Sequence, residues 1–327
     1  MDEATRVPDL IQLPPRPSLL GSFVKMAISG VLLLSVIVCG LLLSIPDVTV
    51  LERCFTTTMF QVKLCPGSPT YAKLSSISSY MIHALIVSED GAFYSHKGFD
   101  WHEISESVTA NLRSGKSGRG GSTLTQQLAK NIFLSADKSV WRKVKEAYLA
   151  NAIEKRYTKD LILEKYLNVV EFGPGIYGIQ AAADHYFHSD PASLHPLQAA
   201  YLVHLLPNPK VYSQGYRKGT LSAFSRRSIS TILKRMSAYG KLNDSSYARS
   251  MTLMEQFPWT SVGYSSFSGA PSYSLETDVP MPKAADLEYD EQSVERLVEE
   301  TENGSLAQPL ETSDDVDREI NSVNDLE

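Results

Sequence analysis

The chain has 327 residues, of which 43% are hydrophobic and 21% charged, and its formal net charge is −6. These values exclude a fully disordered chain, a collagen-like repeat and a small disulfide scaffold, and the length allows one large domain or two ordinary ones. Residues 274–327 hold 17 acidic and three basic residues, a net of −14, which leaves a net of +8 for residues 1–273. The two parts of the chain therefore carry opposite net charge, so the first part attracts a polyanion and the last part repels one.

Residues 26–45 form a run of 20 residues without a charge, long enough to cross the apolar core of a bilayer as a helix. A buried core helix and a cleaved signal peptide are the alternatives. The 25-residue leader and the lack of a small-x-small site before Pro46 disfavour the signal peptide. The sequence thus predicts a cytoplasmic leader at 1–25, a single transmembrane anchor at 26–45 and a neck at 46–70, with only a weak charge bias to orient them.

Two cysteines, Cys54 and Cys65, lie in this neck with ten residues between them. They are able to form a disulfide if their side of the membrane is oxidising. Two free thiols in a flexible neck are the alternative, and the sequence does not decide between them.

Apolar residues recur at three- and four-residue spacing from Tyr71 to about Arg249, which predicts a mainly α-helical domain over 71–250. The expected helices are 72–90, 101–113, 123–134, 139–156, 159–170, 178–187, 196–206 and 221–239. Glycine-rich breaks interrupt them at 114–121, which we expect to be a mobile loop, and at 173–178. The chain then becomes rich in serine, proline and acidic residues, which predicts a disordered acidic tail over 251–327.

The first candidate site is a carboxylate pair, Glu89 and Asp90, at the end of an apolar helical stretch. Negative charge is unfavourable near a helix C-terminus, so helix stability does not explain the pair. A carboxylate partly removed from water has a raised pKa, which suits a general base. Taken alone, such a pair is more typical of a solvated cap than of a catalytic dyad.

A second cluster follows two glycines at the start of the next expected helix. Thr123 and Gln126 have capping-box spacing, and Gln127, Lys130 and Asn131 share one helix face. Free backbone amides, hydroxyls and a lysine after a glycine-rich approach predict a phosphate cradle, although the P-loop spacing is absent. An ordinary capped surface helix is the alternative.

The third cluster contains Arg142, Lys143 and Glu146. Arg142 and Glu146 are four residues apart, and on their own they indicate a surface ion pair. Together with Glu89 and Lys130, however, the three clusters supply two carboxylates and several cations. This inventory fits group transfer from a phosphate-activated donor.

These stretches resemble the peptidoglycan glycosyltransferases, the lipid II polymerases of glycosyltransferase family 51. The resemblance runs from Ala84 to Pro209 and has four motifs in the family's order. The motifs are Glu89-Asp90-x-x-Phe93-x-x-His96-x-Gly98-x-Asp100, Gly120-Gly121-Ser122-Thr123-x-Thr125-Gln126-Gln127-x-x-Lys130-Asn131, Arg142-Lys143-x-x-Glu146, and Ile162-Leu163-Glu164-x-Tyr166-Leu167-Asn168, followed by a stretch from Gly173 to Phe187.

The resemblance implies a lysozyme-like helical catalytic domain with a small membrane-proximal jaw. It also implies a transferase of peptidoglycan synthesis, which joins units of lipid II into glycan strands outside the bacterial cytoplasmic (inner) membrane. The implied partners are lipid II, the nascent glycan strand and the membrane, together with other cell-wall synthesis proteins as an open question. No nucleic acid partner is expected.

The resemblance also implies roles for individual residues. Glu89 is expected to deprotonate the acceptor hydroxyl. Glu146 is expected to lie near the donor pyrophosphate, where it organises cations or a divalent metal such as Mg²⁺ or Mn²⁺. The expected substrate-binding residues are Asp90, Phe93, His96, Thr123, Gln127, Lys130, Asn131 and Arg142. Because an α-linked donor gives a β-linked product, the reaction inverts, with a base on one face and cations on the other.

Residues 1–327 offer no Ser-x-x-Lys module with room for a second enzyme domain, so no transpeptidase is expected and the subclass that the resemblance implies is the monofunctional, membrane-anchored polymerase. Gln198 occupies a position where the family usually has glutamate, and Tyr212-Ser213-Gln214 replaces the usual Tyr-Asn-Pro. Two alternatives stay open at this stage. One is a lysozyme-like enzyme that cleaves peptidoglycan, and the other is a catalytically degenerate, anchored scaffold that binds lipid II or cell-wall partners.

Overall fold

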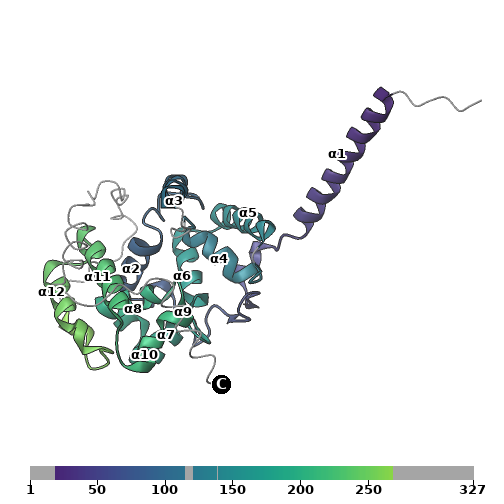
Figure 1. Ribbon diagram of the computed structural model, residues 1–327. Helices are drawn as coiled ribbons and strands as arrows, with labels where there is room; N and C mark the ends of the chain where they lie inside the picture. Colours follow the sequence, from purple (N-terminus) through teal and green to yellow (C-terminus); the bar gives the residue numbers. More distant parts are fainter. Residues whose placement is uncertain (1–18, 115–120, 138, 268–327) are drawn as a thin grey trace, which may run out of the picture. The chain divides into compact units, whose positions relative to one another are not determined.

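The computed structural model describes residues 19–114, 121–137 and 139–267, all within the first of two compact units, 1–277 and 278–327 (Figure 1). Inside helices, some side chains lie outside the description, namely those of 19–21, 37, 38, 41–43, 110, 111, 113 and 114. Most of the predicted glycine-rich loop and the acidic tail from residue 268 onward also lie outside the described residues.

The prediction of a mainly helical fold is confirmed. The helices are α1 Leu19–Leu43, α2 Ser79–Glu89, α3 Trp101–Ser114, α4 Leu124–Phe133, α5 Val140–Arg156, α6 Lys159–Val169, α7 Ile179–Phe187, α8 Pro196–Leu205, α9 Pro209–Tyr212, α10 Gln214–Lys218, α11 Ala223–Ala238 and α12 Asp244–Leu253. Within the described residues, short 3-10 turns and two antiparallel strand pairs accompany the helices, namely β1 Phe55–Thr56 with β2 Lys63–Leu64 and β3 Glu171–Gly173 with β4 Ile176–Tyr177.

One predicted helix, 72–90, begins later than expected. A short 3-10 turn occupies Leu74–Ser76, and α2 starts only at Ser79. The Ser78 hydroxyl accepts a hydrogen bond from the Tyr80 amide at 3.3 Å and donates one to the Leu194 carbonyl at 2.6 Å. A serine in this cap position satisfies an otherwise unpaired amide, so it sets the start of the helix.

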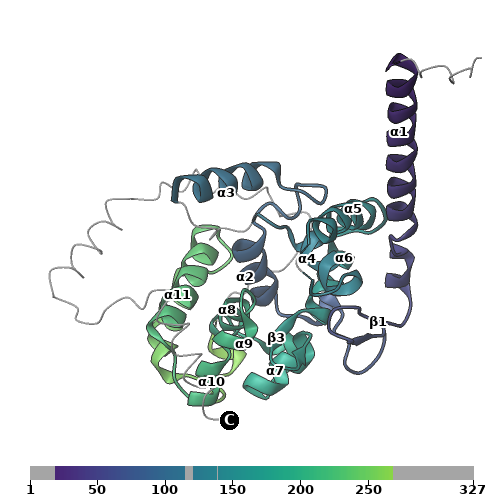
Figure 2. The same cartoon turned by 45° about the vertical axis from the view of Figure 1, so that its right-hand side comes forward.

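The helices pack in two groups. α2, α8 and α11 contact one another and α12 packs on α8 and α11, whereas α4 lies against both α5 and α6 (Figure 2). Each group buries apolar side chains, among them Leu85 of α2 and Leu128 of α4, which are fully buried. Burying one such leucine side chain stabilises the fold by about 2 kcal/mol. The C-terminal end of α2 and the N-terminal end of α4 are joined by polar contacts that build the candidate site.

The motif around Glu164 and Asn168 on α6 has a structural role. The Glu164 carboxylate accepts hydrogen bonds from the Tyr71 hydroxyl at 2.5 Å and the Leu74 amide at 2.8 Å. The Asn168 side chain exchanges two 2.8 Å hydrogen bonds with the backbone of Ala72. These contacts fix residues 71–74, which lead into α2, against α6.

The neck contains a disulfide. Cys54 and Cys65 are bonded, and they bracket the β1–β2 hairpin. The Thr58 amide within the hairpin donates to the Ile132 carbonyl of α4 at 2.8 Å. The structure thus decides the question that the sequence left open, and it shows the neck hairpin docked on the helix that carries the second cluster.

The predicted membrane anchor at 26–45 coincides with most of α1. All described side chains of α1 are exposed, including Phe23, Met26 and Val36. Among the described residues, no helix has both the length and the apolarity to cross a membrane. The transmembrane assignment therefore stays a prediction.

The packed part of the chain continues beyond the predicted boundary at residue 250. Met254, Trp259 and Phe267 are 4%, 1% and 5% exposed, so 251–267 belongs to the folded part instead of the predicted tail. The composition of this segment is polar, but a few aromatic residues suffice to anchor it. Trp259 packs beside Tyr201 of α8, with 6.0 Å between ring centroids, and its indole N–H donates to the Leu253 carbonyl.

Candidate active site

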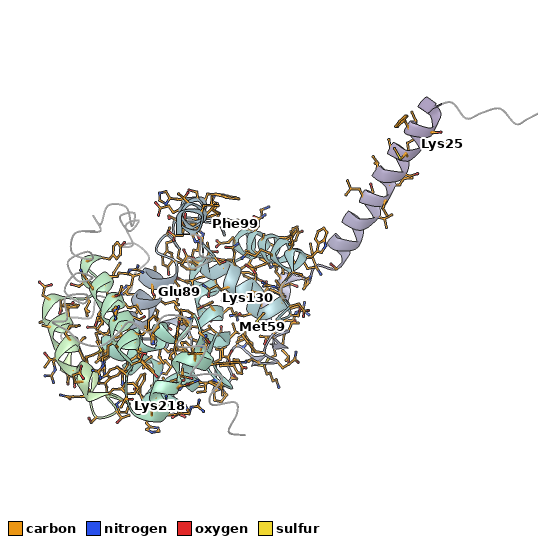
Figure 3. All side chains as sticks on the ribbon, viewed as in Figure 1. Lys25, Met59, Glu89, Phe99, Lys130 and Lys218 are labelled. Carbon is orange, nitrogen blue, oxygen red and sulfur yellow. A yellow bond between two sulfur atoms is a disulfide. The ribbon has the colours of Figure 1, made fainter. Side chains whose placement is uncertain are left out.

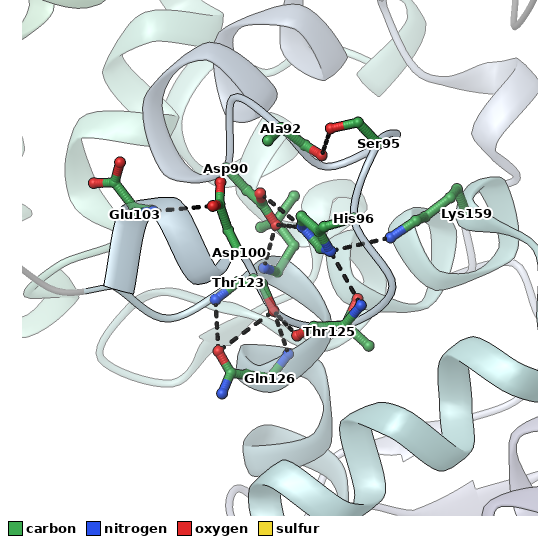
Figure 4. Close-up of polar contacts among 12 residues, drawn as sticks. Asp90, Ala92, Ser95, His96, Asp100, Glu103, Thr123, Thr125, Gln126 and Lys159 are labelled. Atoms are coloured by element: carbon green, nitrogen blue, oxygen red, sulfur yellow. Dashed lines mark hydrogen bonds and ion pairs between the residues drawn. The ribbon is translucent and has the colours of Figure 1, made fainter. Parts of the chain in front are cut away.

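Asp90 joins the end of α2 to the start of α4. Its side chain is 2% exposed, and its Oδ2 accepts a 2.8 Å hydrogen bond from the Leu124 amide in the first turn of α4. His96 Nε2 lies 3.0 Å from both carboxylate oxygens (Figure 4). A carboxylate at a helix N-terminus is favoured by the free amides and the helix dipole. Asp90 therefore holds its neighbour Glu89 at a fixed place beside α4.

The loop after Asp90 fixes the protonation site of His96. The Gly98 amide donates to His96 Nδ1 at 3.1 Å, so Nδ1 is an acceptor and Nε2 carries the hydrogen that faces Asp90. Gly98 has a φ of +91°, and a Cβ there would lie 3.2 Å from the Glu154 side chain. Glycine suits this position because it tolerates both the backbone angle and the close approach.

Lys159 closes the network behind the carboxylate pair. Its ammonium lies 2.7 Å from Glu154 Oε1, 3.5 Å from His96 Nδ1 and 4.6 Å from the centre of the Phe93 ring. Phe93 is fully buried. Predicted substrate-binding residues Asp90, Phe93 and His96 thus have their contacts within the protein, which favours a positioning role for them.

The start of α4 has the capping box that the sequence predicts. Thr123 Oγ1 accepts from the Gln126 amide at 3.3 Å, and Gln126 Oε1 accepts from the Thr123 amide at 2.9 Å. The Thr123 hydroxyl also donates to the Gly98 carbonyl at 2.8 Å. Thr123 is 3% exposed, so it fixes the first turn of α4 against the loop after α2.

Glu89 is the carboxylate that remains available for chemistry. Gln127 Nε2 on α4 donates to its Oε2 at 3.1 Å, and the Tyr166 hydroxyl on α6 donates to Gln127 Oε1 at 2.9 Å. Burial raises the pKa of Glu89, the Gln127 hydrogen bond counteracts the rise, and Asp90 adds to it. A carboxylate with a raised pKa and a defined orientation meets the requirements of a general base.

Glu146 forms the centre of a cationic cluster on α5. It is 2% exposed, and its oxygens contact Arg142 Nη1 at 3.2 Å and the Lys143 ammonium. Lys143 also donates to the Ser122 hydroxyl at 3.0 Å, which links α5 to the residue before the α4 cap. Arg142 Nε is buried and has no hydrogen-bond partner in the described part of the protein. An anion at this place would supply the missing acceptor.

Lys130 on α4 connects the two carboxylates electrostatically. Burial lowers its pKa, while Glu146 and Glu89 both act in the opposite direction, and Arg142 and Lys143 add to the lowering. Glu89 and Lys130 come from neighbouring elements (Figure 3) and influence each other's pKa. Lys130 is therefore within electrostatic range of both Glu89 and the cationic cluster.

The described residues do not fit a metal site built by the protein alone. Within the described part of the chain, no group of three or more His, Cys, Asp or Glu side chains is arranged to hold a metal ion. Glu146 offers one carboxylate whose two oxygens contact Arg142 and Lys143.

The structure brings most of the predicted residues together in two layers. Glu89, Gln127, Lys130, Arg142 and Glu146 form the candidate active site, and a buried network of Asp90, Phe93, His96 and Thr123 lies behind it. Asn131 follows Lys130 on α4 and is 4% exposed.

Sequence reasoning missed two members, Tyr166 and Lys159. Tyr166 belongs to a motif quoted above, and a tyrosine at a core position of a helix signals a hydroxyl that needs a partner. Lys159 begins α6 without a comparable signal.

Comparison with known proteins is consistent with this geometry. Residues 59–237, more than half of the chain, match a family described as transglycosylase. This range begins in the neck hairpin and ends in α11, and it contains every residue of the candidate active site.

Curated relatives carry the name "Biosynthetic peptidoglycan transglycosylase". The protein from Dechloromonas aromatica is 43% identical over 162 residues, which are 50% of this chain and 68% of the relative. The protein from Alcanivorax borkumensis is 48% identical over 136 residues, 42% of this chain and 56% of the relative. The protein from Herminiimonas arsenicoxydans is 45% identical over 160 residues, 49% of this chain and 68% of the relative. The chain thus spans between about half and two thirds of the length of these relatives.

Proposed function

The chain belongs to the transglycosylase family, and on that premise we propose that it polymerises lipid II into peptidoglycan glycan strands by inverting glycosyl transfer, with release of polyprenyl pyrophosphate. One observation carries the proposal: Lys130 lies in the electrostatic field of both Glu89 and Glu146. A carboxylate with a raised pKa and a group of cations within electrostatic range of the same lysine are the groups that an inverting transfer needs.

Each side of the site has its own task in this reaction. Glu89 accepts the proton of the acceptor hydroxyl as that oxygen attacks the anomeric carbon of the donor. Lys130, Arg142 and Lys143 neutralise the charge that develops on the departing pyrophosphate. Glu146 holds Arg142 and Lys143 in position. The scaffold alternative gains no support, because the base and the cations are assembled together.

A membrane-proximal jaw accounts for the apolar surface of α3 and α5. Trp101, Val108 and Leu112 on α3 are 72%, 52% and 79% exposed. The exposed apolar residues of α5 are Val140, Trp141, Val144 and Tyr148. Apolar side chains at helical spacing, exposed on helices near a site for a lipid-linked donor, suit contact with a bilayer surface.

The disulfide and the apolar N-terminal segment support the same location. Disulfides persist in oxidising compartments, so Cys54–Cys65 favours a domain outside the cytoplasm. We propose a single-pass anchor at 26–45 in the bacterial inner membrane, with the catalytic domain on the periplasmic side. The nascent glycan strand and other cell-wall synthesis proteins are the proposed partners.

A polymerisation assay with the full chain in detergent tests the function. Labelled lipid II should be converted to glycan strands, and Glu89→Gln should slow this about 100- to 10,000-fold because the base is lost. Glu255→Gln, the same change at an exposed carboxylate, should leave the rate unchanged. A Glu89→Gln variant with more than a tenth of the wild-type rate would contradict the proposal. Parallel reactions with EDTA, Mg²⁺ or Mn²⁺ test whether a metal takes part.

A further inference from the structure

Three side chains from three helices form a directed chain of hydrogen bonds. The hydroxyl of Tyr166 on α6 donates to Gln127 Oε1 at 2.9 Å, and Gln127 Nε2 on α4 donates to Glu89 Oε2 on α2 at 3.1 Å. Tyr166 is fully buried, and Gln127 is its hydrogen-bond partner among the described residues. The phenol hydroxyl therefore lies in the interior of the protein and points to Gln127.

The carboxamide in the middle of this chain has two unlike ends. Its oxygen only accepts hydrogen bonds and its NH₂ group only donates them. If the amide of Gln127 turned over, its oxygen would face Glu89, and the buried hydroxyl of Tyr166 would lose its acceptor. An unpaired buried donor is costly, so the phenol selects one of the two orientations.

The phenol keeps its proton throughout the working range of pH. Burial raises the pKa of Tyr166 well above its ordinary value, and the negative charges of Glu89 and Asp90 raise it further. The hydroxyl is therefore always a donor toward Gln127. The groups that face Glu89 are Asp90 next to it, Gln127 and Lys130 from α4, and Tyr166 from α6.

We propose that Tyr166 is a positioning residue that fixes the Gln127 amide with its NH₂ group toward Glu89 and so keeps the base ionised and aimed. The inference rests on the proposed function, and it adds the residue that keeps the general base Glu89 ionised. Tyr166 reaches Glu89 through the hydrogen bonds of Gln127.

Loss of the phenol hydroxyl favours the protonated base. In Tyr166→Phe the amide is free to turn, and its oxygen then accepts a hydrogen bond from protonated Glu89. This stabilises the neutral form, so the pKa of Glu89 should rise by about one unit. The acid limb of the kcat–pH profile should move up by the same amount. The rate one unit below the wild-type midpoint should then fall about tenfold, with KM for the donor unchanged.

Carboxyl titration by ¹³C NMR on the full chain gives a readout independent of turnover, with Glu89 assigned by comparison with Glu89→Gln. Tyr201→Phe is the matched control, because Tyr201 is equally buried on α8 and its hydroxyl has no partner among the described residues. That control should leave both the titration and the pH profile unchanged. A wild type that titrates as expected without making polymer would overturn the proposed function and not this inference.

A double-mutant cycle separates positioning from a general loss of stability. Gln127→Met removes the amide and should itself raise the Glu89 midpoint. Adding Tyr166→Phe to Gln127→Met should then change the midpoint no further, because the phenol has nothing left to orient. Additive shifts, or an unchanged Glu89 titration in Tyr166→Phe, would overturn the inference. If Tyr166→Phe does not fold, an unchanged midpoint in Gln127→Met overturns it instead.

Discussion

The candidate active site and the α8–α11 region both bury ionisable groups, but they do so in different ways. In the site, Glu89 has a raised pKa and Lys130 a lowered one, and each is influenced by the other's charge. In the α8–α11 region, burial alone lowers the pKa of His195 to about 3 and that of His204 to about 4.

The partners of these groups explain the difference. His204 lies between the hydroxyls of Ser228 at 2.9 Å and Ser225 at 3.1 Å, and His195 Nδ1 accepts from the Gln198 amide at the start of α8. Neutral histidines satisfy these contacts and hold helices together. A large pKa shift is therefore a poor guide to function unless a second charge shares the site.

The largest expected effect is a loss of polymerisation rate in Lys130→Met, a change in the candidate active site. The substitution keeps the length of the side chain and removes the charge between Glu89 and Glu146. We expect the polymerisation rate to fall about 100- to 1,000-fold, as for other donors that stabilise a developing anion.

The control is Lys155→Met, which changes an exposed lysine on the same helix as Glu146. This variant should retain the wild-type polymerisation rate. A polymerisation rate of Lys130→Met within threefold of the wild-type rate would contradict the prediction. It would show that the charges of the candidate active site matter no more for the reaction than the neutral histidines of the α8–α11 region.

The next effect is a loss of stability in acid that arises in the α8–α11 region. The pKa of His204 is about 6.5 when unfolded and about 4 when folded, so the unfolded chain binds the extra proton between these values. The stability due to neutral His204 is complete above pH 6.5 and is lost as the pH falls toward 4, by about 3 kcal/mol.

Urea unfolding across this range should show a shallower pH dependence for His204→Gln, with polymerisation at neutral pH unchanged. The same change at exposed His102 on α3 should leave the pH dependence as it is. Equal slopes for wild type and His204→Gln would show that this histidine is not held neutral.

The smallest expected effect is the contribution of Glu89, in the candidate active site, to stability. Its pH dependence has the opposite sign to that of His204. Because the folded-state pKa of Glu89 is raised, its contribution to stability is complete below the unfolded value of 4.5 and declines as the pH rises through the folded value. Glu89→Gln should therefore raise the free energy of unfolding at pH 7. Urea unfolding at pH 4 and pH 7 checks this, and a variant destabilised at pH 7 would contradict it.

Sequence periodicity predicted the helices α3 to α8 to within two residues at their ends, because their apolar faces repeat at helical spacing. It extended α2 too far toward the N-terminus, since a serine cap and a 3-10 turn carry no periodic signal. It also assigned 251–267 to a tail, because one buried tryptophan hardly changes the composition of a polar segment.

The sequence predicted which residues belong to the candidate site. It did not predict which of them face the site and which are buried behind it. The motifs contain Asp90, His96 and Thr123, but adjacency in sequence cannot reveal that their polar atoms are satisfied inside the protein. The Gln198 position is a similar case. Its side chain completes a capping box with His195, a task that an amide performs as well as a carboxylate.

The rigidity of α4 gives the proposed reaction a fixed scale. Gln127, which contacts Glu89, and Lys130, whose pKa is influenced by Glu146, are three residues apart on α4, an axial rise of about 4.5 Å. A helix cannot stretch as a loop can, so the backbone spacing between the residue that holds the proposed base and the central lysine stays constant during the proposed reaction.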